Sequence, residues 1–223
     1  MEAGEGGGAD SASGGTSVAP NLYSGNVAGN YYDKYGTRNP IARLLTRGFV
    51  RAVARLARES GARQVLEIGC GEGHLAVRLA REGLTVRGID VTAEIIEAAR
   101  TNARAAGVSV RFDVAGIDDL DPSRDGAELV LCCEVLEHLP DPAAALRAIA
   151  RLARPHALLS VPREPVWRAL NLARGKYWRD RGNTPGHIQH WSARGFLAFA
   201  SRELRPVSVL QPFPWTVVLC RND

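Results

Sequence analysis

The sequence predicts one α/β domain built around a mainly parallel β-sheet. Short apolar segments alternate with helical patterns from Pro40 onward, which is typical of strands joined by right-handed helical crossovers. The segment from Ala127 to Cys133 is continuously apolar, as expected of a central strand covered on both faces. The chain has 223 residues, enough for one domain with a proper hydrophobic core.

The N-terminal region differs in composition from the rest of the chain. Residues 1–29 are rich in Gly, Ser and Ala, and we expect this tail to be disordered. Residues 30–223 then form the folded domain. Its first helix is predicted from Pro40 to Ser60, because apolar residues recur there at helical spacing and Gly61 follows as a stop signal.

A strand, a glycine-rich turn and a second helix come next. Val65 to Ile68 is a short apolar run, and the helical pattern from His74 to Arg81 ends at Gly83. Thr85 to Asp90 is predicted to be the second strand, and Thr92 to Ala106 the following helix. This order places the turn at the N-terminus of a helix, the layout that brings a backbone close to a bound nucleotide.

The second half of the chain continues the alternation. Asp141 followed by Pro142 is a helix start, with an N-cap and then proline in the first turn, and Ser192 caps a later helix. The segment 163–191 between these helices reads as irregular or partly helical. The elements predicted for this half are strands 108–114, 127–133 and 156–161, helices 141–153 and 192–204, and two final strands near 207–210 and 215–220.

Composition limits the classes of protein that remain. The formal net charge of +4 is mild and does not by itself imply a nucleic-acid partner. No apolar run approaches the roughly 20 residues that a bilayer crossing needs, and the N-terminus lacks the layout of a secretion signal. The cysteines show no metal-type or disulfide spacing, since Cys132 and Cys133 would point to opposite faces of one strand. We therefore expect a cytoplasmic protein without membrane insertion, and the oligomeric state stays open.

The most informative stretch joins the first strand to its helix. It reads Glu67-x-Gly69-x-Gly71-x-Gly73, with glycine at every second position behind an acidic residue. Side chains at these positions would hold a nucleotide off the main chain or forbid the turn. Asp90 ends the next strand, where a carboxylate can accept both hydroxyls of a ribose. The alternatives are a dinucleotide-binding domain, whose spacing is G-x-G-x-x-G, and a glycine-rich turn without a ligand.

This pattern resembles the nucleoside-binding signature of class I S-adenosylmethionine-dependent methyltransferases (EC 2.1.1.-). The resemblance implies a Rossmann-like, seven-stranded, mainly parallel sheet with helices on both faces and an antiparallel last strand, which the two final strands without a helix between them fit. It implies S-adenosyl-L-methionine as the cofactor. The cofactor-binding residues that it implies are Glu67, Gly69, Cys70, Gly71, Gly73, Asp90, Val91, Ile117 and Cys133.

The resemblance also implies a role for several of these residues. Glu67 orders the glycine turn, Asp90 holds the ribose hydroxyls, and the carbonyl of Cys133 meets the methionine amine. Gly116 stands where related enzymes often carry an aspartate near the adenine amino group. The side chain that takes this amino group therefore stays open, with Asp118 as one alternative.

Acidic and imidazole side chains follow the fourth strand. Glu134, Glu137 and His138 converge on one side of a helical turn, and His187 and His190 come later. In one interpretation Glu134, Glu137 and His138, together with His187 or His190, hold a divalent metal such as Mn²⁺, Fe²⁺ or Zn²⁺. Small-RNA 3′-terminal 2′-O-methyltransferases, which this motif resembles, use such a set. In the other, the motif is that of ubiquinone-pathway O-methyltransferases, and His187 or His190 is the general base while His138 assists. A purely structural role is the third alternative.

The segment 163–191 is the predicted substrate-side lid. Basic residues interleaved with rings suit single-stranded RNA, and they equally suit an aromatic or anionic small molecule. We favour the small molecule, because the net charge is modest. The residues concerned are Arg163, Arg168, Arg174, Lys176, Arg179 and Arg181, with Trp167, Tyr177, Trp178 and Trp191.

Together these patterns predict an S-adenosylmethionine-dependent enzyme that methylates an oxygen of a small metabolite. The alternative function is metal-assisted 2′-O-methylation of an RNA 3′ end, and a second alternative is a non-catalytic partner subunit with a cofactor-binding fold. The identity of the methyl acceptor lies beyond what these motifs determine.

Overall fold

The structure is a computed structural model that describes residues 21–23, 26–28, 39–175 and 177–223. Most of the predicted disordered tail, residues 1–29, lies outside these ranges, so the prediction of disorder stays a prediction. Within it, β1 (Asn21–Tyr23) and β2 (Asn26–Ala28) pair as antiparallel strands.

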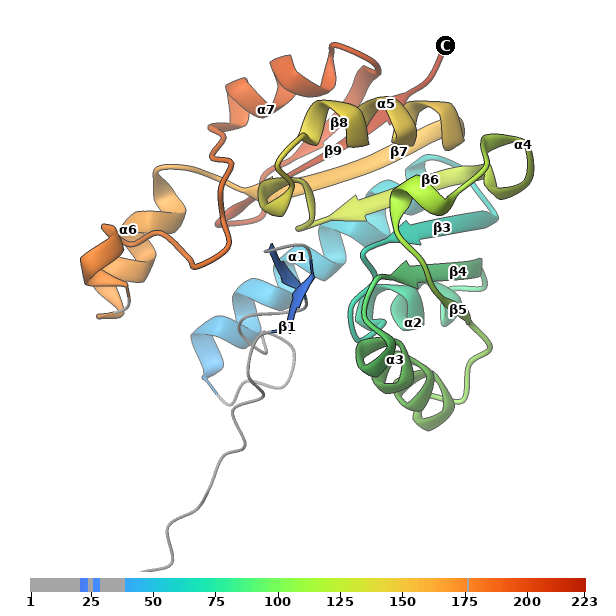
Figure 1. Ribbon diagram of the computed structural model, residues 1–223, viewed down its shortest axis with the longest axis horizontal. Helices are drawn as coiled ribbons and strands as arrows, with labels where there is room; N and C mark the ends of the chain where they lie inside the picture. The colour runs from blue at the N-terminus through green and yellow to red at the C-terminus, as the bar shows by residue number, and fades with distance from the viewer. Residues whose placement is uncertain (1–20, 24–25, 29–38, 176) are drawn as a thin grey trace, which may run out of the picture.

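A seven-stranded sheet forms the centre of the domain (Figure 1). The strand order is β5-β4-β3-β6-β7-β9-β8, and β9 alone runs in the direction opposite to the other strands of this sheet. This confirms the predicted mainly parallel sheet with a reversed last strand. The strands are β3 (Gln64–Ile68), β4 (Thr85–Asp90), β5 (Arg111–Val114), β6 (Ala127–Cys133), β7 (Ala153–Pro162), β8 (Arg205–Leu210) and β9 (Trp215–Arg221).

Helices cover both faces of the sheet (Figure 1). One face packs against α1 (Pro40–Glu59), α2 (His74–Ala80) and α3 (Ala93–Ala105), and the other against α5 (Pro142–Leu152) and α7 (Ala193–Ala200). Successive side chains of a strand point to opposite faces of the sheet, so they pack alternately into the hydrophobic core on one face and the core on the other. The shorter helices and 3₁₀ turns are η1 (Ile117–Asp119), α4 (Pro122–Asp125), η2 (Leu136–His138), α6 (Val166–Ala173) and η3 (Trp178–Asp180).

Side-chain caps begin the helices where the sequence predicts them. The Asp141 carboxylate accepts from the backbone N–H of Ala144 at 2.9 Å, and the Ser192 hydroxyl accepts from that of Gly195 at 3.1 Å. Asn39 caps α1 in the same way. These local bonds set where α1, α5 and α7 start, and therefore how they lie on the sheet.

Three predicted boundaries are wrong. The strand predicted over 156–161 begins three residues earlier, because β7 starts at Ala153. The strand predicted over 108–114 is limited to β5, because the backbone N–H of Val108 bonds to the Ala103 carbonyl and completes the end of α3. The helix predicted over 192–204 stops at Ala200, and the N–H groups of the next residues close single turns before β8 begins at Arg205.

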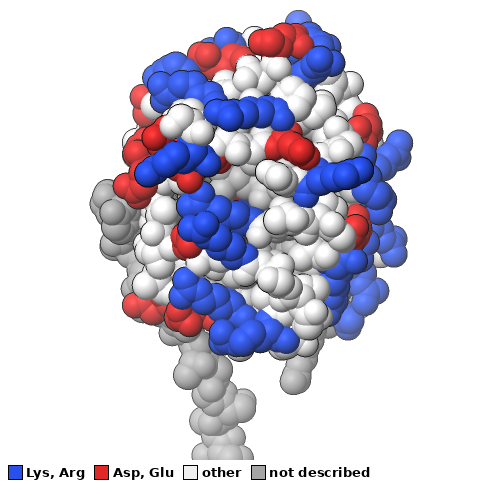
Figure 2. Space-filling view, turned by 90° about the vertical axis from the view of Figure 1, so that its right-hand side faces the viewer, with Lys and Arg blue, Asp and Glu red and all other residues white. Residues whose placement is uncertain are grey.

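The surface mixes both signs of charge on the face that Figure 2 shows. Arg87 forms ion pairs with Asp125 at 2.6 Å and with Asp113 at 2.7 Å. Arg111 shares Asp113, at 2.9 Å. The arginine charges on β4 and at the start of β5 are thus paired with neighbouring carboxylates.

Two further sequence expectations concern the core and the membrane. All four cysteines are unbridged and buried, with Cys132 in the core on the α5 side of the sheet and Cys133 in the core on the α1 side. This confirms the predicted opposite orientation of the pair. In the described part of the chain, none of the helices combines the length and apolarity that crossing a bilayer requires.

Candidate active site

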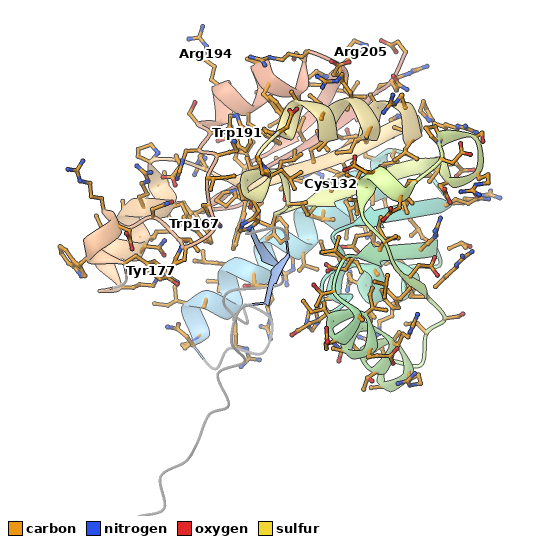
Figure 3. All side chains as sticks on the ribbon, viewed as in Figure 1. Cys132, Trp167, Tyr177, Trp191, Arg194 and Arg205 are labelled. Atoms are coloured by element: carbon orange, nitrogen blue, oxygen red, sulfur yellow. The ribbon has the colours of Figure 1, made fainter. Side chains whose placement is uncertain are left out.

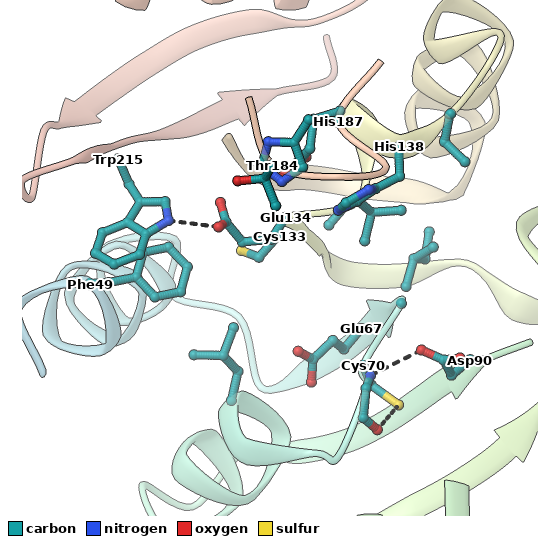
Figure 4. A pocket seen from close by; sticks show the side chains of 18 of the residues that line it. Phe49, Glu67, Cys70, Asp90, Cys133, Glu134, His138, Thr184, His187 and Trp215 are labelled. Carbon is teal, nitrogen blue, oxygen red and sulfur yellow. Dashed lines mark hydrogen bonds between the residues drawn. The ribbon is translucent and has the colours of Figure 1, made fainter. Parts of the chain in front are cut away.

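A cavity of about 650 Å³ opens at the carboxyl ends of the parallel strands. The cavity lies at the end of β3. After β3 the chain continues to β4 on one side of it, and it later forms β6 on the other side. Such a switch point is the usual ligand crevice of an open α/β sheet, because two adjacent strand ends diverge there. Figure 4 shows Glu67, Cys70 and Asp90 at one end of the cavity and His138, Thr184 and His187 at the other.

The glycine bend between β3 and α2 adopts a conformation that favours glycine. Gly69 and Gly73 have φ angles of +68° and +76°. A Cβ on Gly73 would lie 2.7 Å from the Phe112 ring, and one on Gly69 would collide with the Val135 side chain. These two glycines are therefore required by the turn and by the packing around it.

Asp90 lies directly against this bend. One carboxylate oxygen accepts from the backbone N–H of Gly71 and the other from that of Thr92, both at 3.1 Å. Burial raises the pKa of Asp90 above the ordinary aspartate value, and the backbone donors act in the opposite direction. The carboxylate and the bend are thus adjacent, as the sequence predicts.

Most of the predicted cofactor residues line the cavity. Gly73 does not, and it lies behind the bend against Phe112. Burial also raises the pKa of the Cys70 thiol strongly, with Glu67 and Asp90 adding to the effect, so this cysteine stays a thiol at neutral pH. The predicted cofactor residues that do line the cavity are Glu67, Gly69, Cys70, Gly71, Asp90, Val91, Ile117 and Cys133, and Asp118 lines it as well.

Three side chains gather at the other end of the cavity. Potential ligand atoms of Glu137, His138 and His187 lie within 4.8 Å of one another. The two imidazole rings meet edge to face, with centroids 4.8 Å apart. Nδ1 of His138 is 2.9 Å from the carbonyl oxygen of Gly186, which fixes the orientation of that ring. Glu137 is 1% exposed and His187 is 8% exposed, so the cluster is largely shielded from solvent.

Backbone hydrogen bonds hold the His187 loop against η2. The Glu137 carbonyl accepts from the N–H groups of Ile188 and Gln189 at 2.9 and 3.0 Å. The Gln189 amide donates to the Leu139 carbonyl. The loop after α6 is thereby pinned beside the turn after β6, although the two are about 50 positions apart in sequence.

Glu134 and His190 are not members of this three-residue group. Glu134 accepts a hydrogen bond from the Trp215 indole N–H at 2.6 Å, and its φ of +61° is unusual for a residue other than glycine (Figure 4). His190 does not line the cavity, and its Nε2 lies 2.7 Å from the Asn183 amide oxygen. Burial and the nearby charge of Arg168 lower the pKa of His190.

Aromatic walls complete the cavity. The ring of Trp215 lies 5.0 Å from Phe49 and 5.7 Å from Trp167, and Trp167 stacks on His187 at 6.0 Å. Trp167 stands out in the sequence only as one ring of the basic and aromatic segment. Phe49 appears there only as one position of an apolar helix face, so its place in the cavity is a tertiary result.

The strand order, the glycine bend and the acid at the end of the next strand define a class I, nucleoside-binding methyltransferase fold. A family model described as a methyltransferase domain matches residues 38–201, and the chain belongs to this family. Membership confirms the predicted class, an S-adenosylmethionine-dependent methyltransferase, and with it the predicted cofactor.

Known proteins with similar sequences or structures support this family membership. The chain is 32% identical over 200 residues to a ubiquinone biosynthesis O-methyltransferase of Xanthomonas oryzae pv. oryzae, covering 85% of this chain and 82% of the relative. It is 36% identical over 155 residues to the protein of that name from Xanthomonas axonopodis pv. citri, covering 68% of this chain and 64% of the relative, just under two thirds. Magnesium protoporphyrin IX methyltransferase from Synechocystis, solved with bound SAH, has the same fold, with a TM-score of 0.66 at 18% identity over 84% of this chain and 89% of that one.

Proposed function

We propose that the protein transfers the methyl group of S-adenosylmethionine to a hydroxyl oxygen of a small aromatic compound. One observation supports this above the others: a single cavity joins the glycine bend and Asp90 to the buried Glu137, His138 and His187 cluster. The names of relatives at 32–36% identity support oxygen as the acceptor atom. The tryptophan rings in the cavity wall suit a planar acceptor. A cytoplasmic location remains part of this proposal.

The residues at the glycine bend fit the cofactor. A carboxylate offers about four lone-pair positions, so Asp90 can accept ribose hydroxyls while it holds the N–H groups of Gly71 and Thr92. We assign the methionine end to the backbone beyond Gly69 and to the Cys133 carbonyl at the end of β6. When bound, the cofactor supplies an electrophilic methyl group on a sulfonium. The protein has to align the acceptor and remove its proton.

Proton removal is assigned to His138, with His187 beside it. A carbonyl oxygen only accepts hydrogen bonds, so the Nδ1 of His138 carries a proton toward Gly186. In the neutral ring the lone pair then lies on Nε2. With the cofactor bound, its methyl group would pass from sulfur to the acceptor oxygen, and the hydroxyl proton would pass to Nε2 of His138. The products would be a methyl ether and S-adenosylhomocysteine, whose sulfur is a neutral thioether.

The test compares single substitutions of histidine by glutamine with catechol as the methyl acceptor. His138→Gln is expected to lower kcat/KM about 100-fold or more, the usual contribution of a general base, and His187→Gln to lower it less. S-adenosylhomocysteine affinity should stay within about threefold in both, since neither residue is at the glycine bend. His156→Gln, on β7, is the control. Loss of turnover in His190→Gln alone would contradict the assignment.

A divalent metal is the second candidate for the same cluster. Glu137, His138 and His187 would hold it, and one carboxylate with two imidazoles suits Mn²⁺, Fe²⁺ or Zn²⁺ better than Mg²⁺. Such an ion would lower the pKa of a bound hydroxyl. Metal analysis of purified protein, before and after chelation, tests this directly. Turnover that survives complete metal removal excludes the metal role.

The two alternative functions are tested with the same preparation. Methylation of the 3′ end of a short RNA, abolished by chelation, would support the RNA 2′-O-methyltransferase. Binding of S-adenosylhomocysteine without methyl transfer to catechols or to RNA would support the non-catalytic partner subunit. Methyl transfer to catechol alone supports the small-molecule proposal.

A further inference from the structure

One guanidinium lines the cavity on the side of α6. Among the described residues around the cavity, Arg174 is the only arginine or lysine. It follows directly after α6 and caps that helix, with its backbone N–H bonded to the Leu170 carbonyl. Arg174 thus supplies the only guanidinium or ammonium group among the described lining residues, and a guanidinium is a recognition element for a carboxylate.

The Arg174 side chain is held by a buried amide. Its Nη2 donates to the side-chain oxygen of Asn171 at 2.5 Å. Asn171 is 1% exposed, and its amide nitrogen donates to the Gly182 carbonyl at 2.8 Å and to the Thr184 hydroxyl at 3.1 Å. These two bonds fix the direction of the amide oxygen and hence one nitrogen of the guanidinium. Within the described residues Arg174 forms no ion pair, so its other N–H donors are not committed to a carboxylate of the protein.

Buried carboxylates line the cavity at both of its ends. Glu67 and Asp90 lie at the glycine bend and Glu137 lies in the histidine cluster, and each of them is less than 10% exposed. An acceptor that carries its own carboxylate would meet repulsion and desolvation there. Such a group is favoured on the Arg174 side, where the opposite charge lies and solvent is close.

The same residues connect Arg174 to the histidine cluster. The Trp167 ring stacks on His187, and its indole N–H donates to the Thr184 hydroxyl at 2.8 Å. Thr184 is also bonded by Asn171, which holds Arg174. Trp167 therefore contacts both His187 and the side chain of Thr184, which belongs to the network that holds Arg174. An acceptor ring in this part of the cavity can meet both the histidines and Arg174, since all of them line it.

We propose that Arg174 selects acceptors that carry a carboxylate on the ring, remote from the hydroxyl that is methylated. This inference rests on the proposed function and narrows its substrate class from hydroxylated aromatic compounds in general to anionic ones. Arg174 acts as a specificity-determining residue. It holds the carboxylate through charge-assisted hydrogen bonds and takes no part in the transfer itself.

The experiment measures binding of two probes that differ only in the carboxylate. Tryptophan fluorescence is titrated with 3,4-dihydroxybenzoate or with catechol, in the presence of S-adenosylhomocysteine. The wild-type protein is expected to bind 3,4-dihydroxybenzoate about tenfold more tightly, the effect of one charge-assisted hydrogen bond at a partly exposed site. Arg174→Gln should remove this preference and leave catechol affinity unchanged, and Arg174→Lys should keep part of it. Arg194→Gln is the matched control, because Arg194 points away from the domain on α7 (Figure 3).

The outcomes separate this inference from the proposed function. Equal wild-type affinity for the two probes, or a preference that persists in Arg174→Gln, overturns the assignment of Arg174. An equal loss of affinity for both probes in Arg174→Gln also overturns it, because that pattern is one of general positioning. Failure of the wild-type protein to bind S-adenosylhomocysteine, measured first on the same preparation, refutes the proposed function instead. The preference should also weaken between low and high salt, as a charge interaction near solvent does.

Discussion

The position of Asp90 makes the cofactor site directly testable. Each oxygen of this carboxylate accepts one backbone N–H, from Gly71 on the bend and from Thr92 after β4. Asp90→Asn keeps the size of the side chain but removes its charge, and it places an amide N–H₂ against one of these two donors. The variant therefore loses affinity for the ribose and also loosens the bend.

The magnitude follows from the bonds that change. A hydrogen bond to a charged group contributes about 1.5–3 kcal/mol, which corresponds to an affinity roughly 10- to 150-fold weaker for the cofactor product. One backbone donor left without an acceptor in a buried place lowers the free energy of unfolding by about 1–3 kcal/mol. Both effects are expected in Asp90→Asn, because Asp90 is 9% exposed.

Titration calorimetry with S-adenosylhomocysteine and urea unfolding measure the two effects separately. Asp113→Asn is the control, since Asp113 lies beside β4 on β5 and does not line the cavity. That variant should lose some stability and keep its affinity. If Asp90→Asn binds S-adenosylhomocysteine within twofold of the wild type, the ribose assignment is wrong.

The same carboxylate gives the site a pH dependence. Burial raises the pKa of Asp90, so the group takes up a proton at a higher pH than an exposed aspartate does. The protonated group accepts hydrogen bonds less well, so affinity for S-adenosylhomocysteine should fall as the pH falls through this raised pKa. Asp90→Asn should bind weakly at all pH values and lack this transition. A wild-type affinity that is constant from neutral pH down to pH 4 would contradict the ionised form as the binding form.

Three further variants test the packing around the site by urea unfolding. Gly73→Ala should lower the free energy of unfolding by about 2 kcal/mol, because φ is +76° and the new Cβ lies 2.7 Å from the Phe112 ring. Adding Phe112→Leu to Gly73→Ala should recover part of this loss. Trp215→Phe removes the indole N–H that donates a hydrogen bond to Glu134, and it should lower the free energy of unfolding by about 2 kcal/mol. Arg87→Gln removes two partly buried ion pairs, and it should lower the free energy of unfolding by about 1 kcal/mol at pH 7.

The Arg87 effect has a defined pH dependence. Desolvation raises the pKa of Asp113, but hydrogen bonds from Arg87 and Arg111 outweigh it and lower the pKa; hydrogen bonds from the Asp121 backbone and from Arg87 lower that of Asp125. A carboxyl whose folded pKa is lowered contributes stability above its unfolded pKa of about 4. The contribution disappears as the pH falls through the folded value. Arg87→Gln and wild type should therefore differ at pH 7 and converge in strong acid, and a constant difference would contradict this.

Much of the fold is encoded locally and was predictable. A strand shows its period of two or its apolar run, and a helix shows its caps, within about ten residues of sequence. The glycine bend and Asp90 belong to this group, because one βαβ unit contains both and its geometry brings them together. Val108 is an exception, since its apolar side chain suggested a strand while its N–H completes a helix end.

The positions of the side chains at the acceptor end of the cavity are set by contacts between segments that lie far apart in the sequence. His187 and His190 are three positions apart in one loop, and the sequence does not distinguish them. Asn171 and the Glu137 carbonyl orient that loop, and they place His187 in the cavity and His190 outside its lining.

The sequence alone therefore predicted the alternating strands and helices from their periodicity, and it predicted the methyltransferase class and the cofactor bend through a resemblance carried by residues of one βαβ unit. Only the tertiary structure decided that Glu137, His138 and His187 form the cluster, that Phe49 and Trp167 form its walls, and that Arg174 lines the cavity. The physical reason is that side-chain orientation in an irregular loop is set by hydrogen bonds to residues elsewhere in the chain, which leave no periodic pattern in the loop itself.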